Sequence, residues 1–356
     1  MRYLGIDVHV KTSVWCLLDA NGTVLERGKV DTTAVQLTAL VRRLAAEDEL
    51  LAGQEVGKLS YFVYDVLTAA GVKMLSFNAY QLRMIACSRK KTDKRDSYWI
   101  ARALQSGMMP HPVYIPTGEV RLLRSLLSQR RSLVGERKRW LSRARAHLQA
   151  AGYKTRLTRS VPRLIESAVA QPDGLEEHLA ESLELCARME HAASAELKRV
   201  EQQLLQRSKQ QEAIERLKTI PGVGNLVAMT LFAWVGDVSR FPNADELTSY
   251  AGLVSSSWQS AETRRTGRIT KEGSPQLRSV LVQSGHVLLS RCQSDEAAPL
   301  KAKAQRVHTT RARRKIAVVA AARHILRVAY YILRDGTRYD PKRLSSASTE
   351  VRKPAA

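Results

Sequence analysis

Cysteines are few in this chain, and long apolar runs are missing. The four cysteines show no paired spacing, which argues against a disulfide framework and against a zinc site (Cys16, Cys87, Cys186 and Cys292). No apolar stretch approaches the ~20 residues of a membrane-spanning helix. The opening MRYLGIDVHV also lacks the basic segment and long apolar run of a signal peptide. We therefore expect a reduced, cytoplasmic protein with no membrane partner.

Acidic residues are also in short supply. The 356 residues include 57 Lys and Arg against 34 Asp and Glu, which gives a formal net charge of +23. The excess is spread along most of the chain rather than gathered in one tail. Such a charge favours a polyanionic partner, most commonly nucleic acid. The length allows about two domains, each with a sizeable core.

Residues 1–112 alternate between strand and helix patterns. Three short strands come first (RYLGIDV, SVWCLLDA and TVLERGKV), with an Asn21-Gly22 turn before the third. A helix (TAVQLTALVRRLAAE), a strand (LLAGQEV), a helix (LSYFVYDVLTAA), a strand (VKMLSF) and a final helix containing YWIARAL follow. This order predicts an α/β domain with a central mixed sheet.

Residues 113–212 have the pattern of a long helical arm. One apolar seam lies on a basic helix, and a second follows the alternating three and four spacing of a coiled coil, interrupted by Glu190. Pro162, Pro172 and Gly174 mark the break between the two helices. The first seam contains Leu122, Leu126, Leu133, Leu141 and Leu148, and the second contains Leu183, Cys186, Ala193, Leu197, Val200 and Leu204.

Residues 213–340 are predicted to be mainly helical. Their first segment, LKTIPGVGNLVA, fits a helix-hairpin-helix, in which a glycine turn at Gly222 and Gly224 brings backbone N–H groups close to a DNA phosphate. The same pattern also occurs as a plain packing motif. Residues 341–356, rich in Ser, Lys and Pro, are predicted to be disordered.

Four acids stand at positions where an apolar core has no use for them. Asp7 ends the first strand and Glu55 ends the strand LLAGQE, so both are expected at one edge of the sheet. Asp93 and Asp96 lie about one helical turn apart in KKTDKRDS. Singly, each acid also fits a cap or a solvated ion pair. Together they predict a site for divalent cations, and a pair of Mg²⁺ ions would suit phosphodiester chemistry. The basic neighbours, expected to contact nucleic acid, are Lys90, Lys91 and Arg95.

A Ser-rich segment, expected as a loop, lies within residues 251–278. No histidine lies in it, which argues against a Ser/His/Asp triad. The arginines of the segment suit phosphoryl transfer instead, because guanidinium groups bind a phosphate and stabilise the negative charge that develops when the phosphate is attacked. A loop that hydrogen-bonds to itself remains the alternative. The basic residues of this segment, also expected to contact nucleic acid, are Arg264, Arg265, Arg268, Lys271 and Arg278.

The segments GIDVHVKT, GQEVG and KKTDKRDS resemble a known family. They are similar to the DEDD insertion-sequence transposases related to the Piv DNA invertases, the bridge-RNA-guided recombinases of the "IS one-ten" class, whose N-terminal core is RuvC-like (ribonuclease H-like). The resemblance implies that Asp7, Glu55, Asp93 and Asp96 bind catalytic metal. His9 also matches the opening motif, and we expect it to be a structural or supporting residue.

The block AGLVSSSWQSAETRRTGRITKEGSPQLR resembles the segment of the same family that supplies a nucleophilic serine. The resemblance assigns that role to Ser260. Family members usually carry glycine after this serine, whereas this chain has Ala261. Ser255, Ser256 and Ser257 are nearby competitors for the same role.

The resemblance implies a DNA recombinase that cuts and rejoins strands during transposition, with the metal site and the serine forming a composite active site. It implies donor and target DNA, a structured noncoding RNA that pairs with both, and dimers that associate into tetramers. The expected fold is α/β plus mainly α: a RuvC-like domain (1–112), a helical coiled-coil arm (113–212) and a serine-bearing domain (213–340). Two rivals remain: a metal-dependent junction resolvase without serine chemistry, and a non-catalytic nucleic-acid-binding protein.

Overall fold

The structure is a computed structural model. It describes residues 1–85, 93–155, 158, 160–170, 175–260, 263–311 and 314–342. The chain forms two compact units, Met1–Pro116 and Thr117–Ala356. Of the tail predicted to be disordered, 341–356, the first two residues are described and are helical, and residues 343–356 lie outside the described residues.

A five-stranded sheet forms the centre of the first unit, in the order β3-β2-β1-β4-β5. β2 pairs antiparallel with both β1 and β3, whereas β4 pairs parallel with both β1 and β5. The predicted mixed sheet is therefore confirmed. The strands are β1 (Arg2–Asp7), β2 (Thr12–Leu18), β3 (Val24–Asp31), β4 (Leu50–Glu55) and β5 (Lys73–Phe77).

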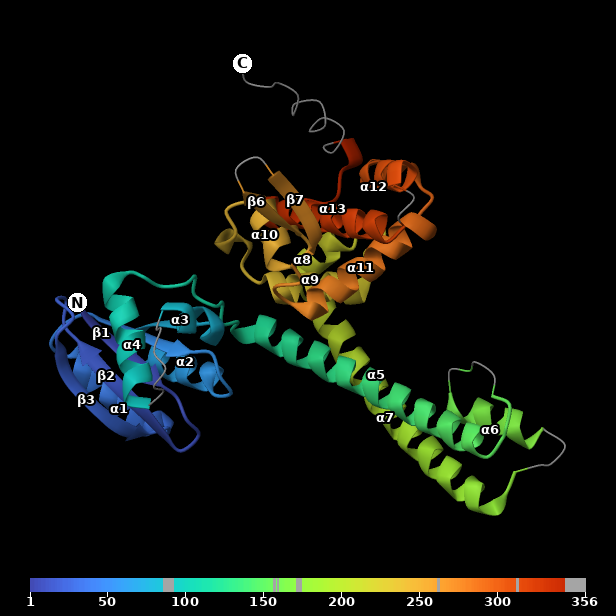
Figure 1. Ribbon diagram of the computed structural model, residues 1–356, viewed down its shortest axis with the longest axis horizontal. Coiled ribbons are helices and arrows are strands. Elements are labelled where there is room, and N and C mark those ends of the chain that lie inside the picture. Colours follow the sequence, from blue (N-terminus) through green and yellow to red (C-terminus); the bar gives the residue numbers. More distant parts are fainter. Residues whose placement is uncertain are drawn as a thin grey trace. The chain divides into compact units, whose positions relative to one another are not determined.

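Helices cover both faces of this sheet (Figure 1). Because successive side chains of a strand point to opposite faces, Leu4 and Ile6 of β1 face one way and Gly5 faces the other. Leu4 and Ile6 join a core with α1 (Ala34–Ala45) and α2 (Ser60–Ala69). Gly5 faces α4 (Asp93–Ser106). The sequence did not predict a further helix, α3 (Ala79–Ile85).

Two long helices, α5 (Gly118–Ala150) and α7 (Glu177–Lys209), lie side by side in the second unit, with the short α6 (Val161–Val169) between them in sequence (Figure 1). They run antiparallel, because Glu119 pairs with Arg207 at 2.7 Å and Arg130 pairs with Glu201 at 2.8 Å.

The predicted seam of α5 is wrong at its first position. Leu122 is 37% exposed, whereas Leu123 and Leu127 are buried. Near its start α5 packs against α9 (Asn225–Val235) as well as α7, and this second neighbour turns the buried face of the helix towards Leu123, Leu126 and Leu127. The hydrophobic spacing alone contained no sign of that neighbour.

Glu190 interrupts the apolar seam of α7, as predicted, and the structure explains why. The residue is buried, and its Oε2 accepts a hydrogen bond of 2.9 Å from the backbone N–H of Val161. Val161 is the first residue of α6, whose opening N–H groups have no partner within the helix. A buried acid in the seam therefore fixes the start of the short helix that connects α5 to α7.

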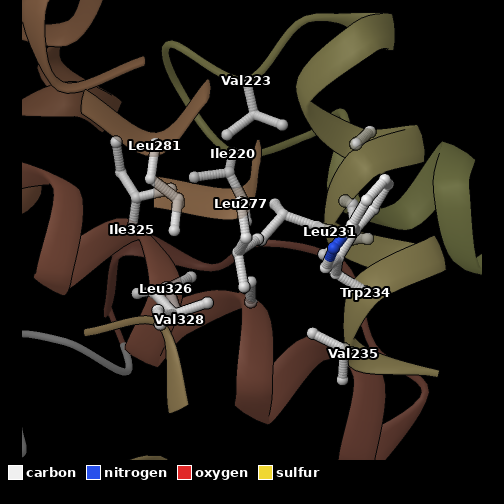
Figure 2. Close-up of a cluster of buried hydrophobic side chains, with 14 of the residues drawn as sticks. Ile220, Val223, Leu231, Trp234, Val235, Leu277, Leu281, Ile325, Leu326 and Val328 are labelled. Carbon is white, nitrogen blue, oxygen red and sulfur yellow. The ribbon is translucent and has the colours of Figure 1, made fainter. Parts of the chain in front are cut away.

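The rest of the second unit is a helical bundle with one large core. Figure 2 shows Ile220, Leu231, Leu277 and Ile325 meeting there from different elements. Beside α9, the bundle contains α8 (Glu212–Leu217), α10 (Ala244–Tyr250), α11 (Pro275–Ser290), α12 (Ala298–Arg311), α13 (Arg314–Asp335), a hairpin of β6 (Ser255–Ser260) and β7 (Thr263–Ile269), and the short helices η1 (Val238–Arg240) and η2 (Asp295–Ala297).

Helix α13 is long and apolar enough to cross a membrane by length and composition. The expectation that no stretch of the chain reaches that length is therefore wrong for this helix. Its apolar residues are, however, largely buried against α10, α11 and α12, with Ala321, Ala322 and Ile325 fully enclosed. A single helix of this kind is weak evidence for a membrane, because the core helix of a bundle has the same composition.

Candidate metal centre and serine hairpin

Two acids stand at the carboxyl ends of neighbouring strands. β1 and β4 run parallel with Ile6 opposite Gln54, so the following residues, Asp7 and Glu55, emerge at the same end of the sheet. The side chain of Asp7 is only 18% exposed. The strand register therefore brings together two carboxylates that are far apart in sequence.

Helix α4 brings the second pair of acids to this unit's sheet. It begins at Asp93, so Asp93 and Asp96 lie in its first turn, where the N–H groups at the helix start favour negative charge. The helix packs closely on β1: a Cβ atom added at Gly5 would lie 2.0 Å from the carbonyl oxygen of Ser97 and 2.5 Å from the nitrogen of Ala101. Gly53 pairs with Gly5 across the strands and faces the same helix. This glycine pair lets α4 lie against the backbone of the sheet.

His9 lies between carboxylates from two elements. Its Nε2 is 3.3 Å from Oδ2 of Asp7 and 3.4 Å from Oδ2 of Asp93. The backbone carbonyl of His9 accepts a hydrogen bond from the Thr32 hydroxyl, which also bonds to Ser13. The connection between β1 and β2 is thus held in place behind the imidazole.

The electrostatics of Asp7 link all four predicted acids. Burial raises the pKa of Asp7 above its usual value of 3.8. His9 lowers this pKa, and the carboxylates of Asp96, Asp93 and Glu55 each raise it. Such coupling requires proximity, because exposed charges more than about 10 Å apart are largely screened at ordinary salt. The three other acids therefore lie near enough to Asp7 to act on its charge.

The donor set fits a divalent cation. Among the described residues, one ligand atom each from Asp7, His9 and Asp93 lie within 4.8 Å of one another. Glu55 and Asp96, which also act on the pKa of Asp7, carry the carboxylate oxygens that hard cations prefer, but neither belongs to this group of three. The sequence predicts His9 only as a structural or supporting residue. Its position two residues after Asp7 is the feature of the sequence that indicates a place beside the acids. Of the basic neighbours, Arg95 is exposed on α4, and Lys90 and Lys91 lie outside the described residues.

The predicted Ser-rich loop is a β-hairpin instead. Ser260 is the last residue of β6 and pairs with Thr263 of β7. At the base of the hairpin, the Ser256 hydroxyl donates to the carbonyl of Arg268 at 3.1 Å. The Thr, Trp and Ile residues of SSSWQS and TRRTGRI favour strands, and this preference outweighs the polar composition. For residues 257–260 and 263–266, including Arg264 and Arg265, the backbone alone is described, and Ala261 lies outside the described residues.

The other basic residues predicted here lie around the base of the hairpin. Arg268 is exposed near the end of β7. Lys271 has a positive φ of 59°. Arg278 is half-buried, and its Nη1 donates to the carbonyl of Ala251 at 3.1 Å. This bond ties α11 to the segment that leads into β6.

The two glycines of the predicted helix-hairpin-helix have different surroundings. Gly222 has a φ of 85° and lies against α11: an added Cβ would be 3.1 Å from the Leu288 Cβ, and the Ser284 hydroxyl donates to the Gly222 carbonyl at 2.6 Å. Gly224 precedes α9, and an added Cβ there would meet no atom within 4 Å. Gly222 thus has a packing role, while Gly224 leaves the start of α9 open on that side.

Two family models match this chain. Residues 4–152 match the model of the DEDD domain of IS110-type elements, described as Transposase. Residues 214–301 match the model described as Transposase IS116/IS110/IS902 family. Together the two segments cover more than half of the sequence. The chain belongs to the IS110 family of transposases.

Curated relatives resemble this IS110-family chain over different shares of its length. The transposase for insertion sequence element IS1111A from Coxiella burnetii is 25% identical over 298 residues, which cover 81% of this chain and 78% of the relative. The putative transposase y4pF/y4sB from Sinorhizobium fredii is 24% identical over 275 residues, 75% of this chain and 70% of the relative. The insertion element IS110 uncharacterized 43.6 kDa protein from Streptomyces coelicolor is 29% identical over 127 residues, 35% of this chain and 30% of that protein.

Membership of the IS110 family makes this protein an insertion-sequence transposase, an enzyme that cuts and rejoins DNA. The match at residues 4–152, which includes nearly all of the first unit, is to a DEDD nuclease domain family of RuvC-like type, and this family implies use of a divalent metal. The cluster of Asp7, His9 and Asp93 is a site of suitable composition for that metal.

Proposed function

We propose that this transposase cuts DNA with two Mg²⁺ ions held by four acids, and that it carries the cut strand on Ser260. The observation that supports the metal site best is the coupling of Asp7 to Asp96, Asp93 and Glu55. Negative charges that raise the pKa of Asp7 repel its carboxylate, and a cation between them relieves that repulsion. Support for Ser260 comes from its sequence block, which lies within the second family match.

The chain's own residues have distinct tasks in this mechanism. Asp7 and Glu55 would hold the metal from the strand ends, and Asp93 and Asp96 would hold it from the start of α4. Bound Mg²⁺ supplies charge neutralisation at the phosphate and activation of a hydroxyl. Arg264, Arg265 and Arg268 would bind the scissile phosphate, with Lys271 and Arg278 nearby in sequence.

The serine step conserves the phosphodiester bond. The Ser260 Oγ attacks phosphorus, its proton leaves, and an Oγ–P bond forms as the P–O bond to one strand end breaks and the departing oxygen takes up a proton. In rejoining, the hydroxyl of the new strand end attacks this phosphoserine and releases Ser260 with its proton. A free serine is a weak nucleophile and requires activation. No histidine lies in residues 251–278, so the activation has to come from outside that segment.

The proposal also includes an RNA guide and an oligomer. A structured noncoding RNA would pair with donor and target DNA, and the net charge of +23 suits a large nucleic-acid load. In this proposal residues 1–112 are the nuclease domain, 113–212 are an arm that joins protomers into dimers and tetramers, and 213–340 bear the serine. Gly224, Lys90, Lys91 and Arg95 would contact the nucleic acid, in the cytoplasm.

Paired substitutions test the two chemical parts. We expect Asp7→Asn to abolish DNA cutting in Mg²⁺ while nucleic-acid binding is retained, because the phosphate contacts are made elsewhere. Ser260→Ala should lose recombination and also lose the protein–DNA adduct trapped with a nicked substrate. The matched control, Ser257→Ala, should recombine normally. Recombination by Ser260→Ala at the parent rate would reject the serine mechanism and favour a metal-dependent resolvase.

Competition binding tests the RNA. Binding should weaken steeply with salt, because each Lys or Arg contact to a phosphate releases counterions. The RNA transcribed beside the gene should displace a scrambled RNA of equal length from the full chain. Equal retention of the two RNAs would contradict a guide and favour a general nucleic-acid binder.

A further inference from the structure

His9 offers a nitrogen donor inside a cluster otherwise composed of carboxylates. Its Nε2 lies 3.3 Å from an oxygen of Asp7 and 3.4 Å from an oxygen of Asp93. The side chain is 49% exposed, so the ring is not buried in a core where it would serve packing alone. The ring thus stands at the open side of the cluster.

The spacing of these three atoms is that of a shared ligand set. Ligands that bind one small cation at about 2.0–2.2 Å lie roughly 3 Å from one another. The two measured separations are close to this value, and all three donor atoms lie within 4.8 Å. A cation between them would need only small movements of the side chains.

Hydrogen bonds hold the backbone of His9 in place without a bound cation. The Thr32 hydroxyl donates to the His9 carbonyl at 2.8 Å and lies 2.8 Å from the Ser13 hydroxyl. Ser13 is fully buried in β2, and Asp7 ends the adjacent β1. Supporting hydrogen bonds of this kind orient metal ligands in proteins.

The geometry points to a mixed nitrogen–oxygen position, formed by Asp7, His9 and Asp93, that binds a first-row transition-metal dication in preference to Mg²⁺. Imidazole is a ligand of first-row ions such as Zn²⁺, Fe²⁺ and Ni²⁺, whereas Mg²⁺ prefers oxygen ligands alone. Glu55 and Asp96 leave oxygen ligands for a second, Mg²⁺-type position. This inference rests on the proposed metal-dependent function and changes it in one respect: a transition-metal ion, with His9 as an added ligand, replaces one of the two Mg²⁺ ions.

Manganese is the probe, because Mn²⁺ is paramagnetic and its nitrogen ligands are detected directly. The full chain is loaded with Mn²⁺, pulsed EPR is recorded for ¹⁴N coupling from a bound imidazole, and Mn²⁺ and Mg²⁺ affinities are measured by calorimetry. We expect the coupling in the parent and its loss in His9→Ala. Mn²⁺ affinity should fall about 10–100-fold, the range for perturbed metal sites, with little change for Mg²⁺. His111→Ala, the matched histidine variant in the same unit, should behave as the parent.

The outcomes separate this inference from the function beneath it. One outcome would overturn the role of His9 and leave the metal site intact: the parent binds Mn²⁺ without imidazole coupling, and Asp7→Asn does not bind Mn²⁺. If His9→Ala loses Mn²⁺ and Mg²⁺ affinity equally, His9 only positions other residues, and the proposed preference for a transition metal over Mg²⁺ is wrong. Absence of any Mn²⁺ or Mg²⁺ binding that depends on Asp7 would reject the metal site itself.

Discussion

Asp7 and Glu55 end strands inside a five-stranded sheet, whereas Ser260 ends a strand of a sheet that has two strands. β1 and β4 have a paired strand on each side and helices on the faces of their sheet. The hairpin is held near its base by the Thr270 N–H to the Val254 carbonyl, 2.9 Å, and by the Lys271 N–H to the Gly252 carbonyl, 3.2 Å. A two-stranded hairpin is at best marginally stable alone. The first site is therefore built into a core, and the second depends on how its base is held.

The largest effects should come from opening a cavity in one unit at a time. Leu67→Ala in the first unit and Leu231→Ala in the second remove side chains that are 0% exposed. Each should lower the free energy of unfolding of its own unit by about 2–5 kcal/mol, the usual cost of this change in a core. Hydrogen exchange of the full chain assigns the loss to a unit. Equal destabilisation of both units by either variant would contradict the division into two cores.

A smaller effect is expected where α4 meets the sheet. Gly5→Ala would place a Cβ against the backbone of Ser97 and Ala101, so the helix must move outward. Overpacking of this kind costs about 1–3 kcal/mol. Because Asp93 and Asp96 are carried by α4, Mn²⁺ affinity should fall as well.

Gly28→Ala is the matched control for the glycine substitution. Its added Cβ would also crowd the unit, 2.7 Å from the Trp15 ring, but on β3 and away from α4. It should lower stability and leave Mn²⁺ affinity unchanged. If Gly5→Ala and Gly28→Ala weaken metal binding equally, the close packing of α4 on Gly5 does not determine the geometry of the site.

The smallest effect concerns the charge of Asp7 in metal-free protein. Its raised pKa means that the folded state binds the proton more tightly than the unfolded chain does. Stability is therefore lost as the pH rises above the usual value of 3.8 and through the raised pKa. Asp7→Asn removes this cost, so in EDTA its first unit should be more stable than the parent at neutral pH, and the difference should shrink as the pH falls through the raised pKa and vanish below 3.8.

Divalent cation should reverse that order. Binding to the folded state alone stabilises the parent, and Asp7→Asn gains less from it. Chemical denaturation at neutral pH, with and without Mn²⁺, measures both signs. A parent that is more stable than Asp7→Asn in EDTA would show that the carboxylate has a structural partner instead.

The sequence predicted the features that depend on local pattern. Strand-end acids are visible because Asp7 and Glu55 follow apolar runs, and the mixed sheet follows from element order. The close packing of α4 on the sheet was not predicted. Gly5 and Gly53 make room for this helix only because the parallel register places them side by side. The hairpin of β6 and β7 was predicted as a loop because most of its residues are polar. The strand preference of its few Thr, Trp and Ile residues was given too little weight.

The register of α5 shows the limit of hydrophobic spacing in another way. A two-helix arm predicts one seam, but Leu123 and Leu127 belong to a core shared with α9, more than ninety residues later in the sequence. Buried Glu190 was visible as an interruption, whereas its partner, the N–H of Val161, depends on the return of the chain. Contacts between distant segments decide such positions, and one helix's sequence does not contain them.

The parallel pairing of β1 with β4 also has a consequence for synthesis. β2, β3 and α1 are made between these strands, and α4 follows only after β5. At about 5–20 residues per second, several seconds separate the emergence of Asp7 from that of Asp96. The antiparallel β1–β2–β3 meander has short connections and can form in that time, whereas the non-local pairing with β4 forms late. The four acids can therefore come together only when the whole first unit has been made, and under the proposed function a nascent chain on the ribosome cannot cut DNA before then.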